Sequence, residues 1–265
     1  MMRNDFKTLM IERPEPHILV VTLNRPDRRN ALDTQMGLDL LELFGALYVD
    51  QEDIRCIVLT GSGSKAFCAG GDLKQRNNMT DESWQSQHAV FEKMTLALMD
   101  CPVPIIAAVN GAAFGGGFEI ALSADFIYAA RSARFAQTET RLGIMPGAGG
   151  TQNLPRACGV RRAKEIIFTG EPFTAEQAYE WGIVNKLCDD QALIDDAMGT
   201  ARKIAANAPI AVRQAKKSVG MATQTDLKTG YAFEIEAYNR MVQTEDRLEG
   251  VRAFNEKREP NFKGR

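Results

Sequence analysis

The stretch that most constrains the fold is Ile105 to Phe126, where an apolar run leads into three consecutive glycines. Ile105–Val109 is a short, continuous apolar segment of the kind that forms a buried strand. Gly115–Gly117 then open an apolar segment that carries a single acid, Glu119. Glycines let a backbone approach a ligand closely, and the first N–H groups of a helix lack intrahelical partners. The stretch therefore predicts a helix start that faces a phosphate or an oxyanion, with a carboxylate one turn away.

The first two thirds of the chain alternate predicted strands and helices. Phe6–Glu12 and His17–Leu23 are apolar and β-branched and flank a proline-containing turn, which predicts an opening hairpin. Further strands are expected at 54–60, 126–129 and 183–187, and helices at 34–48, 79–100, 160–169, 174–181 and 191–206. From residue 209 onward the pattern is helical, over 209–221, 227–242 and 244–256. This order predicts a layered α/β core with a helical appendage, whose apolar faces favour packing onto another subunit.

Charge, cysteine and histidine content argue against several kinds of site. The 32 basic and 34 acidic residues give a net charge of −2, which offers no basis for binding nucleic acid or an anionic membrane. The five cysteines lack metal-like spacing and indicate buried or incidental thiols in a reducing compartment. With only His17 and His88, a Ser-His-Asp triad or a His-rich zinc site is not expected. No signal peptide and no apolar run of roughly 18 residues is evident, so we expect a cytoplasmic protein.

Two acids are candidates for acid–base chemistry without histidine. Glu119 and Glu139 both lie among apolar or small neighbours, where desolvation would raise the pKa of a carboxyl group. Two carboxyl groups in one pocket push their pKa values apart, which leaves one protonated and one ionised near neutrality. The alternative is that each acid simply pairs with an arginine such as Arg134 or Arg141.

A second glycine-rich loop runs from Gly61 to Asp72. Its start, Gly61-x-Gly63-x-x-Ala66, fits only a loose form of the dinucleotide-binding fingerprint, because no helix opens directly after it. The following residues predict a second tight backbone turn that ends at Asp72. Taken alone, such a loop is more often a plain turn than a binding site.

Several motifs in this order resemble one family. They are AVNGAAFGGGFEIALSADF, AFCAGGDLK, ARFAQTETRLGIMPGAGGTQNLPR, the AxxxGIVN segment from Ala178 to Asn185, and the ending FNEKREPNFKGR. Together they are similar to the enoyl-CoA hydratase (crotonase) family over nearly the whole chain. The resemblance implies an α/β fold, a ClpP-like spiral of ββα units, with C-terminal helices that build a trimer, usually paired into a hexamer. It also implies that the substrate is an acyl-CoA thioester.

The resemblance further implies the roles of individual residues. The backbone N–H groups of Gly71 and Gly116 would form an oxyanion hole, while Glu139 acts at C2 of the acyl chain and Glu119 handles the water at C3. The CoA ester would lie near the remaining set, which is Arg28, Ala31, Ala69, Asp72, Leu73, Phe254, Phe262 and Lys263. No metal and no separate cofactor is expected, since coenzyme A is part of the substrate.

Departures within the family narrow the reaction. Members that isomerise dienoyl-CoA or dehydrate carnitinyl-CoA place an aspartate where this chain has Gly147. Hydrolase, decarboxylase and dehalogenase members generally lack one or both glutamates, which this chain keeps. The tail is also similar to methylglutaconyl-CoA hydratase, whose mammalian form binds AU-rich RNA. That activity is not expected here, because Asp33–Asp53 contains six acids and no lysine or arginine.

The sequence therefore predicts a lyase of β-oxidation type, a 2-enoyl-CoA hydratase that adds water across the C2=C3 bond. Residues 1–195 would form the spiral core and 196–265 the helical region of a homotrimer or a dimer of trimers. One group of alternatives stays within the family: a hydratase or dehydratase of a branched or carboxylated acyl-CoA, methylglutaconyl- or carnitinyl-type, or a Δ3–Δ2 enoyl-CoA isomerase that uses Glu139 alone. Another alternative is a non-catalytic acyl-CoA- or RNA-binding protein. No nucleic acid and no membrane is expected as a partner.

Overall fold

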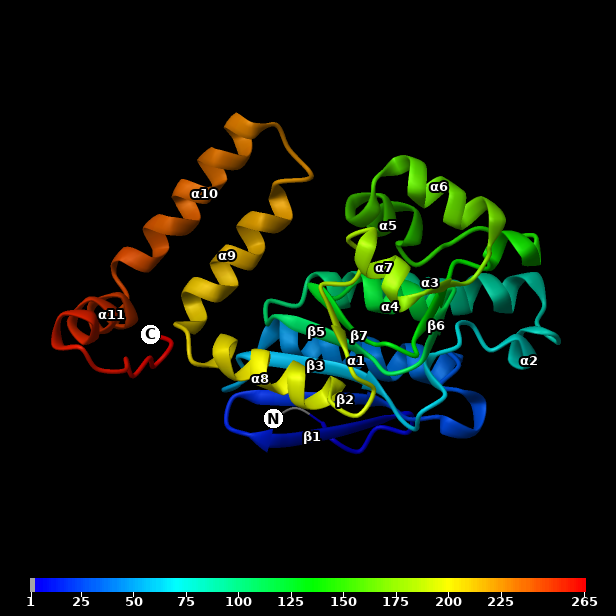
Figure 1. Ribbon diagram of the computed structural model, residues 1–265, viewed down its shortest axis with the longest axis horizontal. Coiled ribbons are helices and arrows are strands. Elements are labelled where there is room, and N and C mark those ends of the chain that lie inside the picture. Colours follow the sequence, from blue (N-terminus) through cyan, green and yellow to red (C-terminus); the bar gives the residue numbers. More distant parts are fainter. Residues whose placement is uncertain (1–2) are drawn as a thin grey trace.

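The computed structural model describes residues 3–265, and its larger sheet has six strands in that range (Figure 1). Their spatial order is β1 (Leu9–Glu15), β2 (Ile18–Leu23), β3 (Cys56–Gly61), β5 (Ile105–Val109), β7 (Phe126–Ala130) and β10 (Lys186–Cys188). β1 and β2 pair antiparallel, which confirms the predicted hairpin, and the remaining neighbours are parallel. The last strand begins later than expected, because Ile183 and Val184 donate their N–H groups to Ala178 in a turn.

A second, smaller sheet escaped the sequence analysis. Its strands are β4 (Ala66–Cys68), β6 (Ala112–Phe114), β8 (Arg134–Ala136) and β9 (Phe173–Thr174), of which β4, β6 and β8 run parallel. Strands of two or three residues are too short to carry a readable alternation. β4, β6 and β8 each follow a longer strand, so β3–β4, β5–β6 and β7–β8 form successive ββ pairs that a helical segment closes. This is the expected spiral of ββα units.

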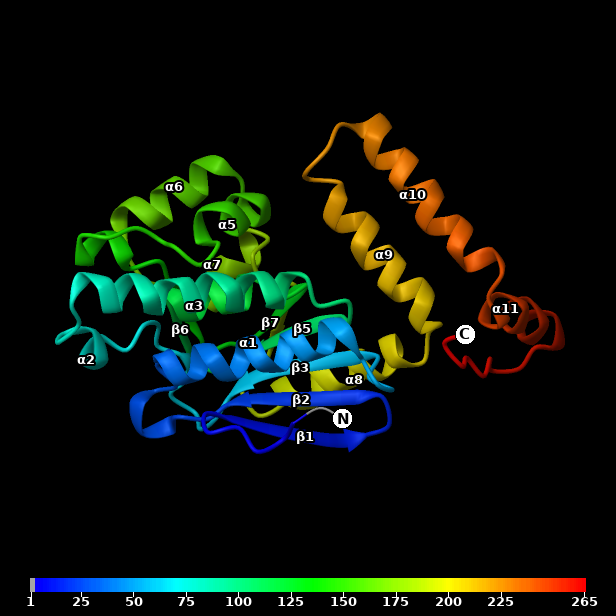
Figure 2. The same ribbon diagram turned by 180° about the vertical axis from the view of Figure 1, so that it is seen from behind.

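Helices cover both faces of the larger sheet (Figures 1 and 2). α1 (Thr34–Val49) and α3 (Asp81–Met99) pack against each other on one face, and α8 (Leu193–Ala205) contacts β2, β3, β5 and β7 on the other. Side-chain caps define where the first two begin, because Asp33 accepts from the Met36 N–H and Thr80 accepts from the Ser83 N–H.

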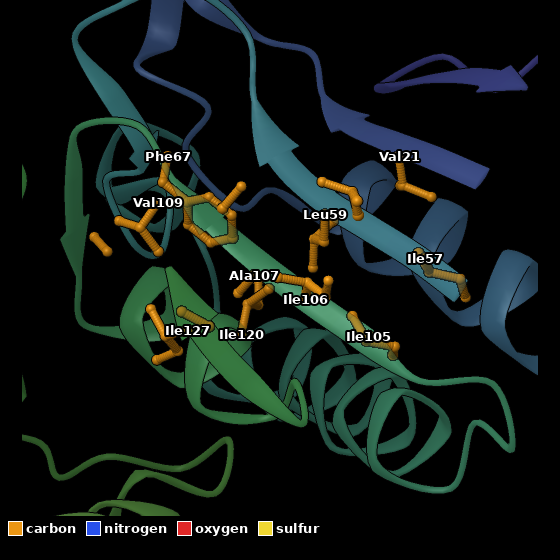
Figure 3. Close-up of a cluster of buried hydrophobic side chains, with 14 of the residues drawn as sticks. Val21, Ile57, Leu59, Phe67, Ile105, Ile106, Ala107, Val109, Ile120 and Ile127 are labelled. Atoms are coloured by element: carbon orange, nitrogen blue, oxygen red, sulfur yellow. The ribbon is translucent and has the colours of Figure 1, made fainter. Parts of the chain in front are cut away.

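The central core lies between β3, β5, β7 and the helices beside them (Figure 3). Every residue of β3 and β5 is buried, as expected for parallel strands covered on both faces. Ile57 and Leu59 from β3 are paired in register with Ile105 and Ala107 from β5, and Ile120 from α4 (Gly116–Leu122) belongs to the same buried cluster. This packing holds the start of α4 in a fixed place relative to the strands.

Shorter elements complete the region around the smaller sheet. They are η1 (Pro26–Arg28), α2 (Leu73–Arg76), η2 (Glu139–Leu142), α5 (Gly150–Cys158), α6 (Val160–Thr169) and α7 (Ala175–Glu180). Thr174 and Gln177 form a capping box at the start of α7. All five cysteines are free and four of them are buried, in agreement with their assignment as incidental thiols.

The last three helices form an arm that projects from the core (Figures 1 and 2). They are α9 (Pro209–Met221), α10 (Leu227–Val242) and α11 (Glu245–Glu256), and α10 packs back along α9. Lys216 ties α9 to the core through Asp125, at 2.7 Å. The division expected after residue 195 falls inside α8, whose contacts are with the core, so the part that projects begins at Pro209. Within residues 3–265, no helix is long and apolar enough to cross a bilayer.

Candidate active site

Gly71 and Gly116 meet at one edge of the smaller sheet. Gly71 follows β4 and Gly116 follows β6, and parallel neighbouring strands end at the same edge. The two backbones approach closely because there are no side chains between them. A Cβ on Gly70, which has φ of 91°, would lie 2.6 Å from the Phe114 carbonyl oxygen, and one on Gly117 would lie 2.1 Å from that of Cys68.

The N–H groups of Gly71 and Gly116 are both available to a ligand. A Cβ on Gly116 would lie only 3.9 Å from the Gly71 nitrogen, so the two donors border the same space. In the part of the chain that the structure describes, neither N–H donates to an acceptor of a turn, a loop or a neighbouring element. Gly116 is also the first residue of α4, where the N–H groups lack intrahelical acceptors. The pair can stabilise a negative charge on an oxygen atom.

Glu119 is buried in α4, one turn after Gly116, and only 3% of it is exposed. Its Oε1 accepts hydrogen bonds from the backbone N–H groups of Ala148 and Gly150, each at 2.8 Å. Gly150 is the first residue of α5, so the positive end of a second helix dipole also faces this carboxylate. Glu119 is therefore held by backbone donors, and the alternative of an arginine partner is wrong.

Glu139 is the first residue of η2, which follows β8, the third parallel strand of the smaller sheet, and it faces the same space. It is 8% exposed, and the Gln137 side-chain amide lies 3.4 and 3.5 Å from its two carboxylate oxygens. Arg141 pairs instead with Glu171, at 3.4 Å, so Glu139 also lacks the arginine partner considered from the sequence. Gly115, at φ of 50°, makes room for Glu139, since a Cβ there would lie 3.0 Å from its Oε1.

Burial sets the protonation behaviour of the two glutamates. Burial, and after it the nearby charge of Glu119, together raise the pKa of Glu139 to about 7. Burial also raises the pKa of Glu119, but the hydrogen bonds from Gly150 and Ala148 oppose that shift by stabilising the ionised form. This difference favours Glu139 as the protonated member of the pair and Glu119 as the ionised one.

A cavity of about 510 Å³ connects the two glycines and the two glutamates. Its remaining lining is largely apolar and includes Leu32, Trp84, Phe91, Leu142, Ile144 and Met145. A pocket of this kind, with a few converging polar groups and carboxyl groups of raised pKa, is the usual form of a small-molecule site. The two glycine N–H groups can bind a carbonyl oxygen, and the two glutamates can accept or donate protons at nearby atoms of the same ligand.

Comparisons with known proteins agree with this geometry. The family model described as enoyl-CoA hydratase/isomerase matches residues 13–265. A crystal structure of an enoyl-CoA hydratase from Bacillus anthracis matches with a TM-score of 0.96 and 42% identity, over 98% of this chain and 100% of that one. This chain belongs to the enoyl-CoA hydratase/isomerase family.

Two family members illustrate its range of reactions at similar identity. The short-chain-enoyl-CoA hydratase of Clostridium acetobutylicum is 38% identical over 262 residues, which are 98% of this chain and 100% of that protein. The (E)-benzylidenesuccinyl-CoA hydratase of Thauera aromatica is 39% identical over 248 residues, which are 94% of this chain and 96% of that protein. The family and its crotonase fold are thus established, while the acyl group has to be argued from the site.

The residues expected to hold the CoA ester divide into those that reach the cavity and those that do not. Ala69 and Leu73 line it beside Gly71. Arg28 is exposed on η1 and Ala31 is half-buried; neither lines the cavity. The Ala31 carbonyl accepts a hydrogen bond from Arg25.

Asp72 has a different role from the one expected of it. Its Oδ1 accepts from the Lys74 and Gln75 N–H groups at the start of α2, at 3.1 and 3.3 Å. Its Oδ2 accepts from Arg25 Nη2 at 3.0 Å. Because the fold already occupies both oxygens, Asp72 supports the loop that carries Gly71 and is not free to bind a ligand.

The three tail residues lie on the arm and not beside the cavity. Phe254, at 84% exposed, belongs to α11, and the Lys263 N–H donates to Asp246 of the same arm at 2.6 Å. Phe262 packs near Gly250, also on α11. Within a single chain the arm points away from the site (Figure 1), so a contribution of these residues to CoA binding stays a prediction.

Three residues in or beside the cavity were not given an individual role from the sequence: Arg76, His88 and Gln137. Gln137 is fully buried beside Glu139, and Arg76 and His88 line the cavity. The His88 ring occupies the space that a side chain at position 147 would need, where some family members have an aspartate. A Cβ on Gly147 would lie 2.3 Å from His88 Nε2. Of the three, only Arg76 could have been found from the sequence, because it is a charged residue five positions after Gly71. In residues 3–265 no cluster of three or more His, Cys, Asp or Glu side chains is arranged to hold a metal ion.

Proposed function

We propose that the protein is a 2-enoyl-CoA hydratase, which adds water across the C2=C3 bond of an acyl-CoA thioester. The observation that carries this proposal is the single cavity bordered by two free backbone N–H groups and two buried glutamates that form no ion pair with an arginine within residues 3–265. Hydration of an enoyl thioester needs these groups: donors for the enolate oxygen, a base for the water and an acid for C2.

In the proposed reaction the thioester oxygen accepts hydrogen bonds from the Gly71 and Gly116 N–H groups. Glu119, ionised, takes a proton from water while the water oxygen bonds to C3, and the electrons of the double bond move onto the thioester as an enolate. Glu139, protonated, then gives its proton to C2, so the product is a 3-hydroxyacyl-CoA. Removing one donor of an oxyanion hole typically costs roughly 100- to 1,000-fold in rate.

The environments of the two glutamates support this division of roles. The backbone N–H groups of Ala148 and Gly150 favour the ionised form of Glu119, whereas Glu139 has a pKa of about 7. The reaction balances with these residues and water alone, so we propose that no metal or redox cofactor takes part.

The alternatives differ in what they need from the site. The carnitinyl- and dienoyl-type reactions imply an acid at position 147, where any side chain would require the His88 ring to move. A Δ3–Δ2 isomerase would need Glu139 and not Glu119. A non-catalytic binding protein would need neither carboxyl group.

We also propose that the arm builds a homo-oligomer, a trimer or a dimer of trimers. α10 carries a stripe of exposed apolar side chains at helical spacing, which are Leu227, Tyr231, Ile235, Tyr238 and Val242. Exposed apolar stripes of this kind mark surfaces that pack against protein. Cytoplasmic location and use in β-oxidation stay predictions from the sequence.

The loss of the enone absorbance of crotonyl-CoA tests the hydratase proposal. Glu119→Gln and Glu139→Gln should each lower kcat by roughly 100- to 10,000-fold, while a saturated acyl-CoA ester still binds. Full hydration by either variant would overturn the two-glutamate mechanism. Retention of double-bond migration by Glu119→Gln alone would favour the isomerase.

A further inference from the structure

Arg76 is a cation in the cavity wall that has no carboxylate partner. It lies at the end of α2 and is half-buried, and its Nε donates to Gln87 Oε1 at 2.9 Å. Among the residues that the structure describes, no Asp or Glu side chain lies within ion-pair distance of it, and its two terminal nitrogens donate to no acceptor. The part of the guanidinium that best recognises a carboxylate is therefore free.

Surrounding side chains hold this guanidinium in one orientation. It lies over the Trp84 ring, 4.2 Å from the centroid, and 5.6 Å from that of Phe91. Its acceptor Gln87 is 3% exposed and is itself fixed, because its Nε2 donates to Thr34 Oγ1 at 2.8 Å and to Gln75 Oε1 at 2.9 Å. Arg76 is thus pre-organised before any substrate binds, which reduces the entropy lost on binding.

The position of the guanidinium limits what can reach it. A Cβ on Gly71 would lie 3.2 Å from Arg76 Nη1, so the terminal nitrogens lie next to the oxyanion hole. The cavity wall around them is apolar, with Trp84, Phe91 and Leu142 among its residues. Burial lowers the pKa of Arg76, and only the more distant charges of Glu139 and Glu119 oppose this. A neutral acyl chain would leave this cation desolvated and unpaired, which is unfavourable.

We propose that Arg76 binds a carboxylate on the acyl chain, so that the preferred substrates are short 2-enoyl-CoA thioesters that carry a carboxylate group. This inference rests on the proposed hydratase function. The acyl chain of the substrate has to be short, because its thioester oxygen is held at Gly71 and Gly71 lies beside the same guanidinium. The planar fork of arginine matches a carboxylate in two parallel hydrogen bonds, which a lysine or a neutral side chain cannot provide.

An alternative role for Arg76 makes a different prediction. The cation could serve only to hold the two glutamates by its charge, with no contact to the acyl chain. In that case its removal would affect all enoyl-CoA esters equally and would shift the pH profile of each. Substrate discrimination therefore separates the two roles.

The first experiment uses the wild-type protein. kcat/KM is compared for glutaconyl-CoA, which ends in a carboxylate, and hex-2-enoyl-CoA, which has a similar length and no charge. We expect a clear preference for glutaconyl-CoA. Hydration of hex-2-enoyl-CoA without that preference would overturn the inference and leave the hydratase proposal intact, whereas hydration of neither ester would count against the hydratase itself.

Variants then assign the preference to Arg76. Arg76→Met should lower the ratio of the two kcat/KM values by roughly 100-fold, and Arg76→Lys should retain part of it. The matched control is Lys74→Met, which removes an exposed cation from the same helix and should leave the ratio unchanged. An equal loss on both esters in Arg76→Met would overturn the inference.

A binding measurement keeps the test independent of turnover. Glutaryl-CoA and hexanoyl-CoA are saturated, so their dissociation constants report recognition of the acyl chain alone. The wild-type protein should bind glutaryl-CoA more tightly, and Arg76→Met should reverse that order with hexanoyl-CoA. Equal affinities in the wild-type protein would contradict a carboxylate site at Arg76.

Discussion

The Gly150 backbone nitrogen lies 2.8 Å from Glu119 Oε1 and joins the start of α5 to a carboxylate on α4. This contact has no room for a side chain at Gly150. A Cβ there would lie 2.9 Å from Glu119 Oε1 and 2.6 Å from Gln137 Nε2. The glycine therefore fixes the position of Glu119, one of the two proposed catalytic groups, and lies beside Gln137, which supports the other.

Replacing Gly150 should misplace Glu119 without removing it. Gly150→Ala is expected to lower kcat/KM for crotonyl-CoA by about 100-fold, because a misplacement of about 1 Å in an active site can cost that much. Gly45→Ala is the matched control, since a Cβ at Gly45 has no atom within 4 Å. That control should keep full activity and gain about 0.5–1 kcal/mol in the free energy of unfolding, as alanine favours a helix. Unchanged kcat/KM in Gly150→Ala would contradict the role given to this contact.

The raised pKa of Glu139 predicts how hydration depends on pH. In the proposed mechanism hydration requires Glu139 to be protonated, and its pKa is about 7, so kcat/KM should fall about tenfold per pH unit above that value. Dehydration of the 3-hydroxyacyl-CoA uses the form with Glu119 protonated and Glu139 ionised, which carries the same number of protons, so its kcat/KM should fall in parallel, as a pH-independent equilibrium constant requires. Initial rates in both directions between about pH 6 and pH 9 provide the measurement. A flat hydration profile over that range would exclude Glu139 as the acid.

The same shift predicts a stability effect. Because the pKa of Glu139 is raised from 4.5 to about 7, the folded protein binds this proton more tightly than the unfolded chain does. Stability from this group is present at low pH and is lost as pH rises toward about 7. Glu139→Gln should therefore raise the free energy of unfolding at about pH 8 by at most about 3 kcal/mol, and by little at about pH 4. Denaturant titrations at both pH values test this, with the exposed Glu180→Gln as a control that should show no such difference.

The exposed stripe on α10 predicts an oligomer that charge can disrupt. Tyr231 and Tyr238 are 59% and 60% exposed and lie two turns apart on one face of the helix. Tyr231→Glu combined with Tyr238→Glu should reduce the native mass from a multiple of the chain to a single chain, because it places charge in an apolar contact. Arg240→Glu alters charge on the other side of α10 and should leave the mass unchanged. A wild-type protein that is monomeric in native mass spectrometry would contradict the proposed role of the arm.

Much of the fold follows from local patterns. Continuous apolar runs predicted β3 and β5, and helical periodicity placed α6, α9 and α10 at the boundaries that the structure has. These elements are long enough for their hydrophobic pattern to be recognised, so the local sequence is sufficient to predict their secondary structure. The smaller sheet could not be found in this way, since its strands have two or three residues and exist only because their partners lie beside them.

The sequence by itself determined the family and indicated the candidate site residues, because these glycines and glutamates belong to motifs that are contiguous in the chain. Only the tertiary structure decided how they act together. Gly71, Gly116 and Glu139 follow β4, β6 and β8, and the parallel pairing of those strands brings three distant segments to one edge. The raised pKa of Glu139 arises from the same assembly, and so does the position of Arg76, which has no carboxylate partner among the described residues. Both depend on desolvation and on neighbours distant in sequence, which no local pattern records.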